Sequence, residues 1–256
     1  MHTFVAMQEL LVGLLIGGLA GILSGLAGVG GGIVIVPLLT LGVGLDQHTA
    51  QGTSLLAFSL PVLAGAAWQY WRQGRADVKL AAWTALGLVS TGLLSSSIAQ
   101  GIPTKALTRL FAALLALIGV YLLWRSYRKL SAQGKSRLPR WLIGLIAGAA
   151  AGTLSGLAGL GGGIVIVPLL ILLGRLDQHT AQGTSLVTLS FPVLIFALWP
   201  YAQGGRVEYL LGLGIAAGLL ISGSFSARLA QRVPTRSLSR FFAFVVIGIG
   251  LYQLLR

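Results

Sequence analysis

The chain has 256 residues; 55% of them are hydrophobic, only 9% are charged, and the mean hydropathy is +0.88. A soluble globular protein carries roughly 25% charged residues, so this chain is expected to lie in a lipid bilayer. The 18 Lys and Arg exceed the five Asp and Glu, but they occur singly or in small groups between apolar runs, which argues against nucleic-acid binding. There is no cysteine, which excludes disulfides, thiol nucleophiles and thiolate metal ligands.

The sequence consists of two similar halves. Residues 20–39, AGILSGLAGVGGGIVIVPLL, recur at 151–170 with two substitutions, and LDQHTAQGTSL at 45–55 recurs unchanged at 176–186. Residues 125–140, between the halves, are polar, rich in Lys and Arg, and free of acids. The predicted organisation is a first transmembrane repeat at 1–124, a basic cytoplasmic linker at 125–140 and a second transmembrane repeat at 141–256.

Each half is predicted to contain about five hydrophobic helical segments. In the first half we expect them, in chain order, at residues 10–27, 32–45, 48–71, 80–99 and 106–124. A membrane-spanning helix needs about 20 apolar residues, and the second segment, which follows a glycine run and contains Pro37, is shorter. This segment and its copy at 163–176 either cross the membrane as broken helices or turn back as re-entrant hairpins.

The basic residues favour one topology. If each half crosses five times, the second half is inverted, and the linker side of the membrane collects every Lys and Arg except Lys105, Arg109, Arg206 and Arg256. If each half crosses four times, the halves are parallel and the basic residues are spread more evenly. Because cytoplasmic loops carry an excess of Lys and Arg, the sequence favours inverted repeats, a common plan of secondary transporters.

Each half has a glycine-rich turn before its second segment, GVGGG at 28–32 and GLGGG at 159–163. Backbone N–H groups in such a turn, at the start of a helix, can bind an anion. The alternatives are a simple loop or close helix packing. Neither copy fits the GxGxxG dinucleotide motif or the P-loop motif. The glycines predicted to bind an anion are Gly30, Gly31, Gly32, Gly161, Gly162 and Gly163.

The segment DQHTAQGTS opens the third apolar segment of each half, at 46–54 and 177–185. Its amides and hydroxyls can bind an oxyanion without a buried positive charge; the alternative is helix capping and interhelical hydrogen bonding. The residues predicted to bind substrate here are Gln51, Gly52, Thr53, Ser54, Gln182, Gly183, Thr184 and Ser185. Candidates for proton coupling, with a structural His–Asp pair as the alternative, are His48, His179, Asp46 and Asp177.

Other features narrow the function further. All five acids lie at or between the ends of apolar segments, which argues against a metal-cation pathway. No HExxH or GxSxG motif occurs, so we predict no enzyme activity, no metal and no cofactor. Glycines at every fourth position, from Gly13 to Gly25 and from Gly144 to Gly156, predict close helix packing. The predicted hinges are the prolines Pro37, Pro61, Pro168 and Pro192.

Two duplicated patterns resemble the TauE/SafE sulfite exporter family, also called TSUP transporters. They are G-x-G-G-G-x-x-x-x-P, from Gly28 to Pro37 and Gly159 to Pro168, and A-x-G-T-S, from Ala50 to Ser54 and Ala181 to Ser185. The resemblance covers essentially the whole chain. It implies a multi-pass carrier in the inner membrane of a bacterium or archaeon, with sulfite, sulfonates or related organic anions as substrates.

We therefore predict an all-α, polytopic membrane protein with two inverted repeats and broken or re-entrant helices after the glycine runs. Its predicted function is the secondary transport, as an exporter, of small sulfur-containing or organic anions by alternating access. The expected partners are the anion, the lipid bilayer and protons as a candidate coupling ion, but no nucleic acid; the oligomeric state stays open. Two other hypotheses remain, a non-transporting membrane scaffold or assembly factor and an anion channel.

Overall fold

The computed structural model describes residues 2–27, 31–127, 136, 138–230 and 235–255. Every regular element in these residues is helical, which confirms the predicted all-α class. In chain order the elements are α1 (His2–Ala27), α2 (Gly32–Pro37), η1 (Leu38–Val43), α3 (Gln47–Ser59), α4 (Ala64–Arg72), α5 (Val78–Gln100), α6 (Thr104–Tyr127), α7 (Arg140–Ala158), α8 (Gly163–Leu172), α9 (Gln178–Ser190), η2 (Pro192–Leu194), α10 (Ile195–Gln203), α11 (Tyr209–Ala230) and α12 (Thr235–Leu255).

The described residues contain four to six units that are long and apolar enough to cross a membrane. Four are single helices, α1, α5, α6 and α7, and two more are bent pairs, α3 with α4 and α9 with α10. Shorter apolar helices follow the two glycine runs and occur within α11 and α12. The protein is therefore a polytopic membrane protein, as its composition predicts.

Both bent pairs break at a proline. The helices bend by 45° around Pro61 and by 56° around Pro192. The residues before these prolines, Leu60 and Phe191, are extended, with ψ angles of 152° and 147°, because a proline ring clashes with a helical residue before it. The other two prolines that we predicted as hinges lie inside helices, Pro37 at the end of α2 and Pro168 within α8.

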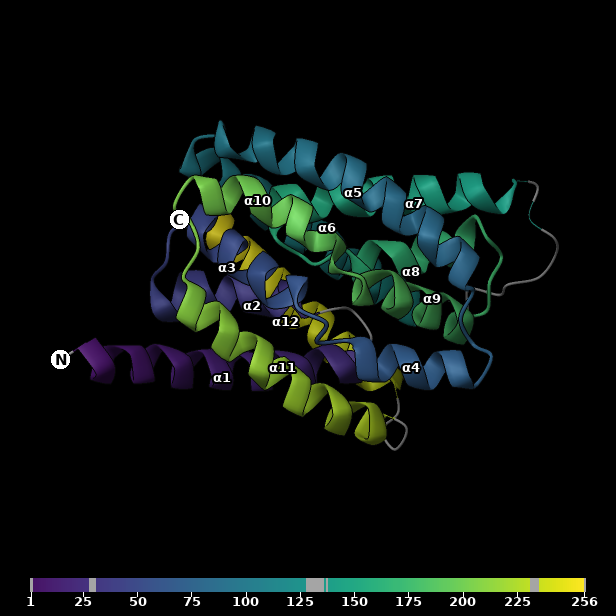
Figure 1. The fold of residues 1–256 in the computed structure, drawn as a ribbon, viewed down its shortest axis with the longest axis horizontal. Coiled ribbons are helices and arrows are strands. Elements are labelled where there is room, and N and C mark those ends of the chain that lie inside the picture. Colours follow the sequence, from purple (N-terminus) through teal and green to yellow (C-terminus); the bar gives the residue numbers. More distant parts are fainter. Residues whose placement is uncertain (1, 28–30, 128–135, 137, 231–234, 256) are drawn as a thin grey trace.

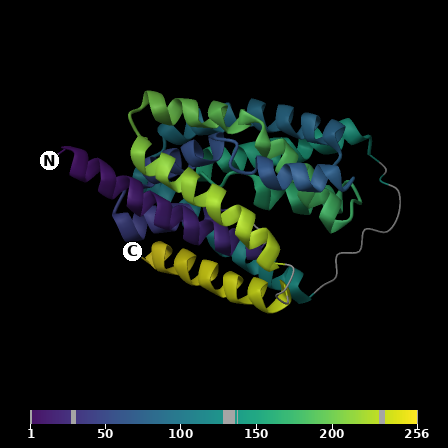
Figure 2. The same cartoon turned by 60° about the horizontal axis from the view of Figure 1, so that its bottom comes forward.

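Helices of one half pack against helices of the other. α1 lies along α11, α5 along α7, and α6 along α12, and Figures 1 and 2 show the first of these pairs side by side. A Cβ atom on Gly17 would overlap the carbonyl oxygen of Ile215, and one on Gly148 would overlap that of Thr84. The glycines repeated at every fourth position thus allow the close helix packing that we predicted.

Contacts between helix starts define two ends of the molecule. At the linker end, Arg140 at the start of α7 forms an ion pair with Asp77 before α5, and the Asp77 N–H donates to Thr184 in α9. At the far end, the N–H of Glu208 before α11 donates to Thr53 in α3. Figure 1 shows α1 beginning at the far end, on the left, and α7 beginning at the linker end, on the right.

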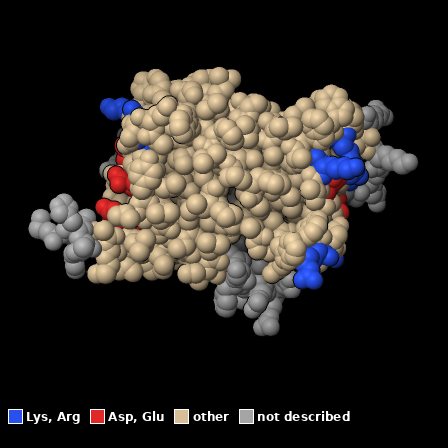
Figure 3. All heavy atoms as spheres, viewed as in Figure 1, with Lys and Arg blue, Asp and Glu red and all other residues tan. Residues whose placement is uncertain are grey.

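The charged side chains also lie at these two ends. Figure 3 shows Lys, Arg, Asp and Glu at the left and right of the visible face, with an uncharged band between them. Outward-facing side chains of the helices that cross this band, such as Leu15, Leu94 and Leu117, are large, apolar and exposed. This arrangement suits a bilayer across the middle of the molecule.

The second half shows how the short segment after a glycine run is accommodated. Gly162 lies beside Ala151 and Leu88, in the middle of α7 and α5. From there α8 returns to the linker end, where the carbonyl of Leu173 accepts a hydrogen bond of 2.7 Å from Ser136. Ten helical residues span only about 15 Å, so the non-helical residues 159–162 supply the rest of the return path. This path corresponds to the broken crossing rather than to a re-entrant hairpin, which would leave α9 starting at the far end.

Candidate functional site

The turn between α7 and α8, residues 159–162, is buried at the centre of the molecule; we call it the glycine loop. Gly159, Gly161 and Gly162 have φ angles of +67°, +71° and +78°. Side chains with a Cβ atom rarely adopt this left-handed conformation, so the path of the loop requires glycine. The sequence motif thus places non-helical backbone in the buried interior of the protein.

The glycine loop offers hydrogen-bond donors. Among the described residues, the N–H groups of Leu160, Gly161 and Gly162 donate no hydrogen bond. They immediately precede α8, so the positive end of its helix dipole adds to their field. Ser155 in α7 is fully buried and its Oγ has no partner. A Cβ atom on Gly162 would lie 3.1 Å from this Oγ, so the hydroxyl faces the loop.

Residues from both halves surround the loop. The hydroxyl of Ser54 in α3 donates a 2.8 Å hydrogen bond to the carbonyl of Gly159, and the ring of Phe58 covers Gly161. A Cβ atom on Gly32, at the start of α2, would lie 2.6 Å from the carbonyl carbon of Leu160, so the glycine segments of the two halves touch. Gly31 also lies against Phe58, Gly163 faces Ser185, and Gly30 is outside the described residues.

The predicted threonines and their neighbouring glycines lie elsewhere. At the far end, Thr53 Oγ1 accepts a hydrogen bond of 3.0 Å from the Glu208 N–H. At the linker end, Thr184 Oγ1 accepts a hydrogen bond of 3.0 Å from the Asp77 N–H. Gly52 and Gly183 pack tightly against the carbonyls of Arg206 and Arg75, respectively. These four residues join each third segment to a turn of the other half, and the structure does not bring the two copies together.

The two glutamines also differ in their surroundings. Gln51 is fully buried beside Gly159, and its Oε1 accepts a 2.8 Å hydrogen bond from Tyr201. Gln182 is half-buried, and its Oε1 lies 3.4 Å from the Tyr70 hydroxyl. Gln51 therefore adjoins the glycine loop from the far end, whereas Gln182 is held weakly near the linker end.

Comparisons with other proteins agree with this architecture. The sulfite exporter TauE/SafE family profile matches residues 13–253. The chain belongs to the TauE/SafE family. A "Probable membrane transporter protein" of Xylella fastidiosa is 32% identical over 98% of this chain and 97% of its own length. Bacillus subtilis YdhB, also named a probable membrane transporter, is 29% identical over 84% of this chain and 88% of its own length. No solved structure is significantly similar to the chain.

As a TauE/SafE protein, the chain is a membrane transporter. Two of its aspartates are predicted candidates for proton coupling, and the structure shows where they lie. Asp46 and Asp177 cap α3 and α9 by accepting hydrogen bonds from the N–H groups two and three residues further along the chain. Hydrogen bonds from Thr180 lower the pKa of Asp177; partial burial raises the pKa of Asp46, but bonds from Thr49 outweigh this and lower it. Both carboxylates are therefore ionised at neutral pH.

The two histidines of this TauE/SafE chain are placed differently. His48 is buried, and its Nε2 lies 3.1 Å from the carbonyl of Ile102 in the turn after α5. His179 is exposed at the linker end. Neither histidine lies at the glycine loop, and their role in proton coupling stays a prediction.

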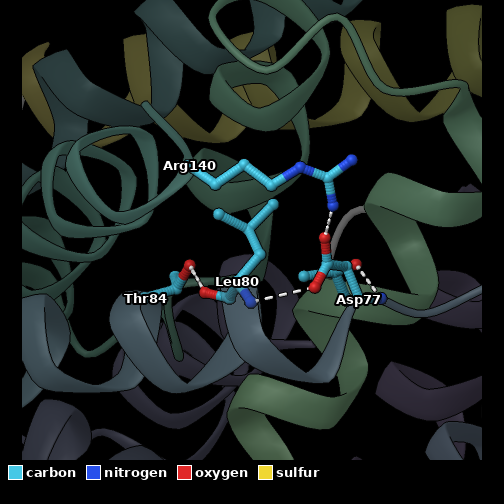
Figure 4. Close-up of polar contacts among 5 residues, drawn as sticks. Asp77, Leu80, Thr84 and Arg140 are labelled. Carbon is cyan, nitrogen blue, oxygen red and sulfur yellow. Dashed lines mark hydrogen bonds and ion pairs between the residues drawn. The ribbon is translucent and has the colours of Figure 1, made fainter. Parts of the chain in front are cut away.

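Sequence reasoning missed three side chains that surround the loop and Gln51, namely Ser155, Phe58 and Tyr201. Ser155 lies within the duplicated LSGLAG motif, which was a usable signal, because a serine one turn before a glycine run faces that run. Tyr201 is buried, and its hydroxyl also lies 2.8 Å from the carbonyl of Gly156. Figure 4 shows a further missed contact, the ion pair of Arg140 with Asp77.

Proposed function

We propose that the protein is a secondary transporter that carries small oxyanions, such as sulfite or a sulfonate, by alternating access. The observation that supports this most is the glycine loop, where three unpaired N–H groups and the Ser155 hydroxyl meet at the start of α8. A helix start with free N–H groups attracts negative charge. The proposed binding residues are Leu160, Gly161, Gly162 and Ser155, with Gly31, Gly32, Gly163, Ser54 and Ser185 around them.

The chemistry of this site suits transport. All of its donors are neutral, so it can attract an anion without paying the high desolvation penalty of a buried Lys or Arg. A site of neutral dipoles also binds weakly enough to release its ion, which a carrier requires. The oxygens of an anion as small as sulfite would replace the missing partners of the loop amides.

The arrangement of the halves supports alternating access between inverted repeats. α1 and α7 begin at opposite ends, and the glycine segments of the halves meet at the centre. Phe58 covers Gly161, one turn before the break at Pro61, so bending there would move its ring off the loop. We assign Pro61 and Pro192 as the main hinges and the basic linker to the cytoplasm, with the repeats at 1–124 and 141–256.

The test is anion flux into proteoliposomes with sulfite, sulfoacetate, sulfate and a neutral solute, with and without a pH gradient. We expect saturable flux of at least one anion but not of the neutral solute. Gly162→Ala should reduce flux more than about tenfold, because it strains the loop and crowds Ser155. Gly44→Ala is the matched control, since Gly44 also has a positive φ, +85°, but adjoins open space.

Three results would contradict parts of the proposal. The first is wild-type flux from Gly162→Ala, which would show that the glycine loop does not bind the anion. The second is no flux of any anion by folded protein, which would favour a scaffold. Flux that does not saturate would favour a channel instead of alternating access.

A further inference from the structure

A second group of buried polar atoms lies on one face of the first turns of α3. Gln47, His48 and Gln51 are 2%, 1% and 0% exposed. Within the part of the chain that the structure describes, Gln47 Nε2 and Oε1, His48 Nδ1 and Gln51 Nε2 have no hydrogen-bond partner. Burying polar atoms without partners destabilises a protein, so a group of them requires an explanation.

Two further side chains complete this group. Tyr201 from α10 holds Gln51, and its ring centre lies 6.5 Å from that of His48. Gln100, at the end of α5, has an unpaired Nε2 and lies two residues before the Ile102 carbonyl that His48 contacts. We call these five residues, Gln47, His48, Gln51, Gln100 and Tyr201, the amide cluster.

The amide cluster connects two other features. On its inner side, Gln51 touches Gly159 of the glycine loop. On its outer side, Gln100 lines a surface depression of about 520 Å³ at the far end, together with Ser97, Gln203 and Arg206. The amide cluster therefore has one member at a surface depression that contains Arg206 and another against the proposed central site.

We propose that the amide cluster is a second oxyanion subsite, through which the anion passes between the Arg206 depression and the glycine loop. This inference rests on the proposed function. The unpaired amide nitrogens of Gln47, Gln51 and Gln100 are donors that fit the oxygens of an anion. Arg206 attracts the anion to the mouth of the path.

The acceptors of the cluster narrow the ligand class. His48 Nε2 donates to the Ile102 carbonyl, which leaves Nδ1 as an acceptor, and Gln47 Oε1 is a second acceptor without a partner. A ligand that contacts both donors and acceptors has several oxygens and at least one hydrogen to donate. An oxyanion that retains a proton, such as hydrogensulfite, fits this description better than a fully deprotonated one.

The duplicated sequence supplies a matched control. Gln178 and His179, which correspond to Gln47 and His48, are exposed at the linker end. Replacing an unpaired buried amide by an apolar side chain of similar shape does not weaken a fold, so Gln47→Leu should retain or raise the unfolding temperature. Its effect on transport is therefore separable from folding.

The first test is the concentration dependence of sulfite flux. We expect Gln47→Leu to raise KM by about tenfold and Gln178→Leu to leave KM within about twofold of wild type. A KM within twofold of wild type for Gln47→Leu would overturn the subsite, while intact wild-type flux would leave the transport proposal standing.

A second test does not depend on transport and uses the absence of cysteine from the chain. The purified full-length variant Gln100→Cys is reacted with an anionic, sulfonate-bearing thiosulfonate reagent and with its cationic counterpart; Gln73→Cys, on the exposed turn after α4, is the control. We expect the anionic reagent to be favoured at position 100, and the non-nucleophilic anion sulfoacetate to slow its reaction there but not at position 73. Equal preference and no protection would overturn the subsite. Protection without flux in wild type would keep the subsite and refute the transporter proposal.

Discussion

The two copies of DQHTAQGTS have the same nine residues but different surroundings. One face of each copy makes equivalent contacts: an aspartate caps the helix, a threonine accepts a turn N–H from the other half, and a glycine packs on a carbonyl. The other face differs, because Gln47, His48 and Gln51 are buried, whereas Gln178 and His179 are exposed. Identical sequence therefore specifies the interface between the halves but not the environment of the remaining polar side chains.

A sequence difference between the halves accompanies this asymmetry. Arg140 pairs with Asp77 at the linker end, and the corresponding residues at the far end are Glu9 and Glu208, both acidic. An ion pair thus joins the halves at one end, whereas like charges occupy the corresponding positions at the other. A duplicated scaffold can therefore acquire two different ends through one exchanged charge and through different hydrogen-bond partners for a few amide side chains.

The largest effects are expected where the copies are equivalent. Gly52→Ala and Gly183→Ala would each drive a Cβ atom into the carbonyl oxygen of Arg206 or Arg75, so both should lower the free energy of unfolding by about 1–3 kcal/mol. Thermal unfolding in detergent measures this, with Gly18→Ala as a control because nothing lies near its Cβ position. A large loss in only one copy would show that the interface is not symmetric.

Substitution of Thr53 and Thr184 tests whether the two copies make equivalent contacts, with a smaller expected loss of stability. Thr53→Val leaves the Glu208 N–H without its acceptor, and Thr184→Val does the same to Asp77, so each should cost about 1–2 kcal/mol of stability. Anion affinity measured on the same variants tests the predicted role in substrate binding. We expect it to change less than about twofold, because both hydroxyls already serve turns at opposite ends. A large loss of anion affinity with unchanged stability would show that these threonines do contribute to substrate binding.

Substitution of the two tyrosines that contact Gln51 and Gln182 should affect stability differently in the two copies. Tyr201→Phe removes the hydroxyl that lies 2.8 Å from Gln51 Oε1 and from the Gly156 carbonyl, and should lower stability by about 1 kcal/mol. Tyr70→Phe removes a contact of 3.4 Å to half-buried Gln182, and should change stability by less than about 0.5 kcal/mol. The measurement is the unfolding temperature of the two variants. Equal decreases would show that Gln51 and Gln182 are held equally strongly by their tyrosines.

Much of the fold was accessible from the sequence. Apolar segments and their prolines predict the helices and the breaks at Pro61 and Pro192, because proline acts locally on the residue before it. The glycine stripes predict helix packing for a similarly local reason, since only small residues allow such close approach. The path of residues 163–176 was left open, because it depends on contacts of α8 with distant segments rather than on its own composition.

The site was accessible only in part. The glycine motif points to the loop, and the polar segment points to Gln51 and Ser54, which do adjoin it. Sequence pattern cannot tell which face of a helix meets which partner, so Thr53 and Thr184 were grouped with Gln51 and Ser54, although the two threonine hydroxyls accept hydrogen bonds from turns at opposite ends of the molecule. Burial is a tertiary property, and for that reason the contrast between His48 and His179 was invisible in two identical segments.

The smallest expected effect concerns the exchanged charge, and it tests whether position 9 is equivalent to position 140. Arg140→Gln removes the ion pair with Asp77, and Glu9→Arg should create one with Glu208 if α1 lies on α11 as α7 lies on α5. Surface pairs contribute about 0.2–1 kcal/mol, so the unfolding temperature should fall slightly in the first variant and rise slightly in the second. Both shifts should shrink in high salt, where exposed charges are screened. A Glu9→Arg variant with no salt-dependent gain would mean that the far end is not a rearranged copy of the linker end, and the asymmetry would then extend to the packing of the helices themselves.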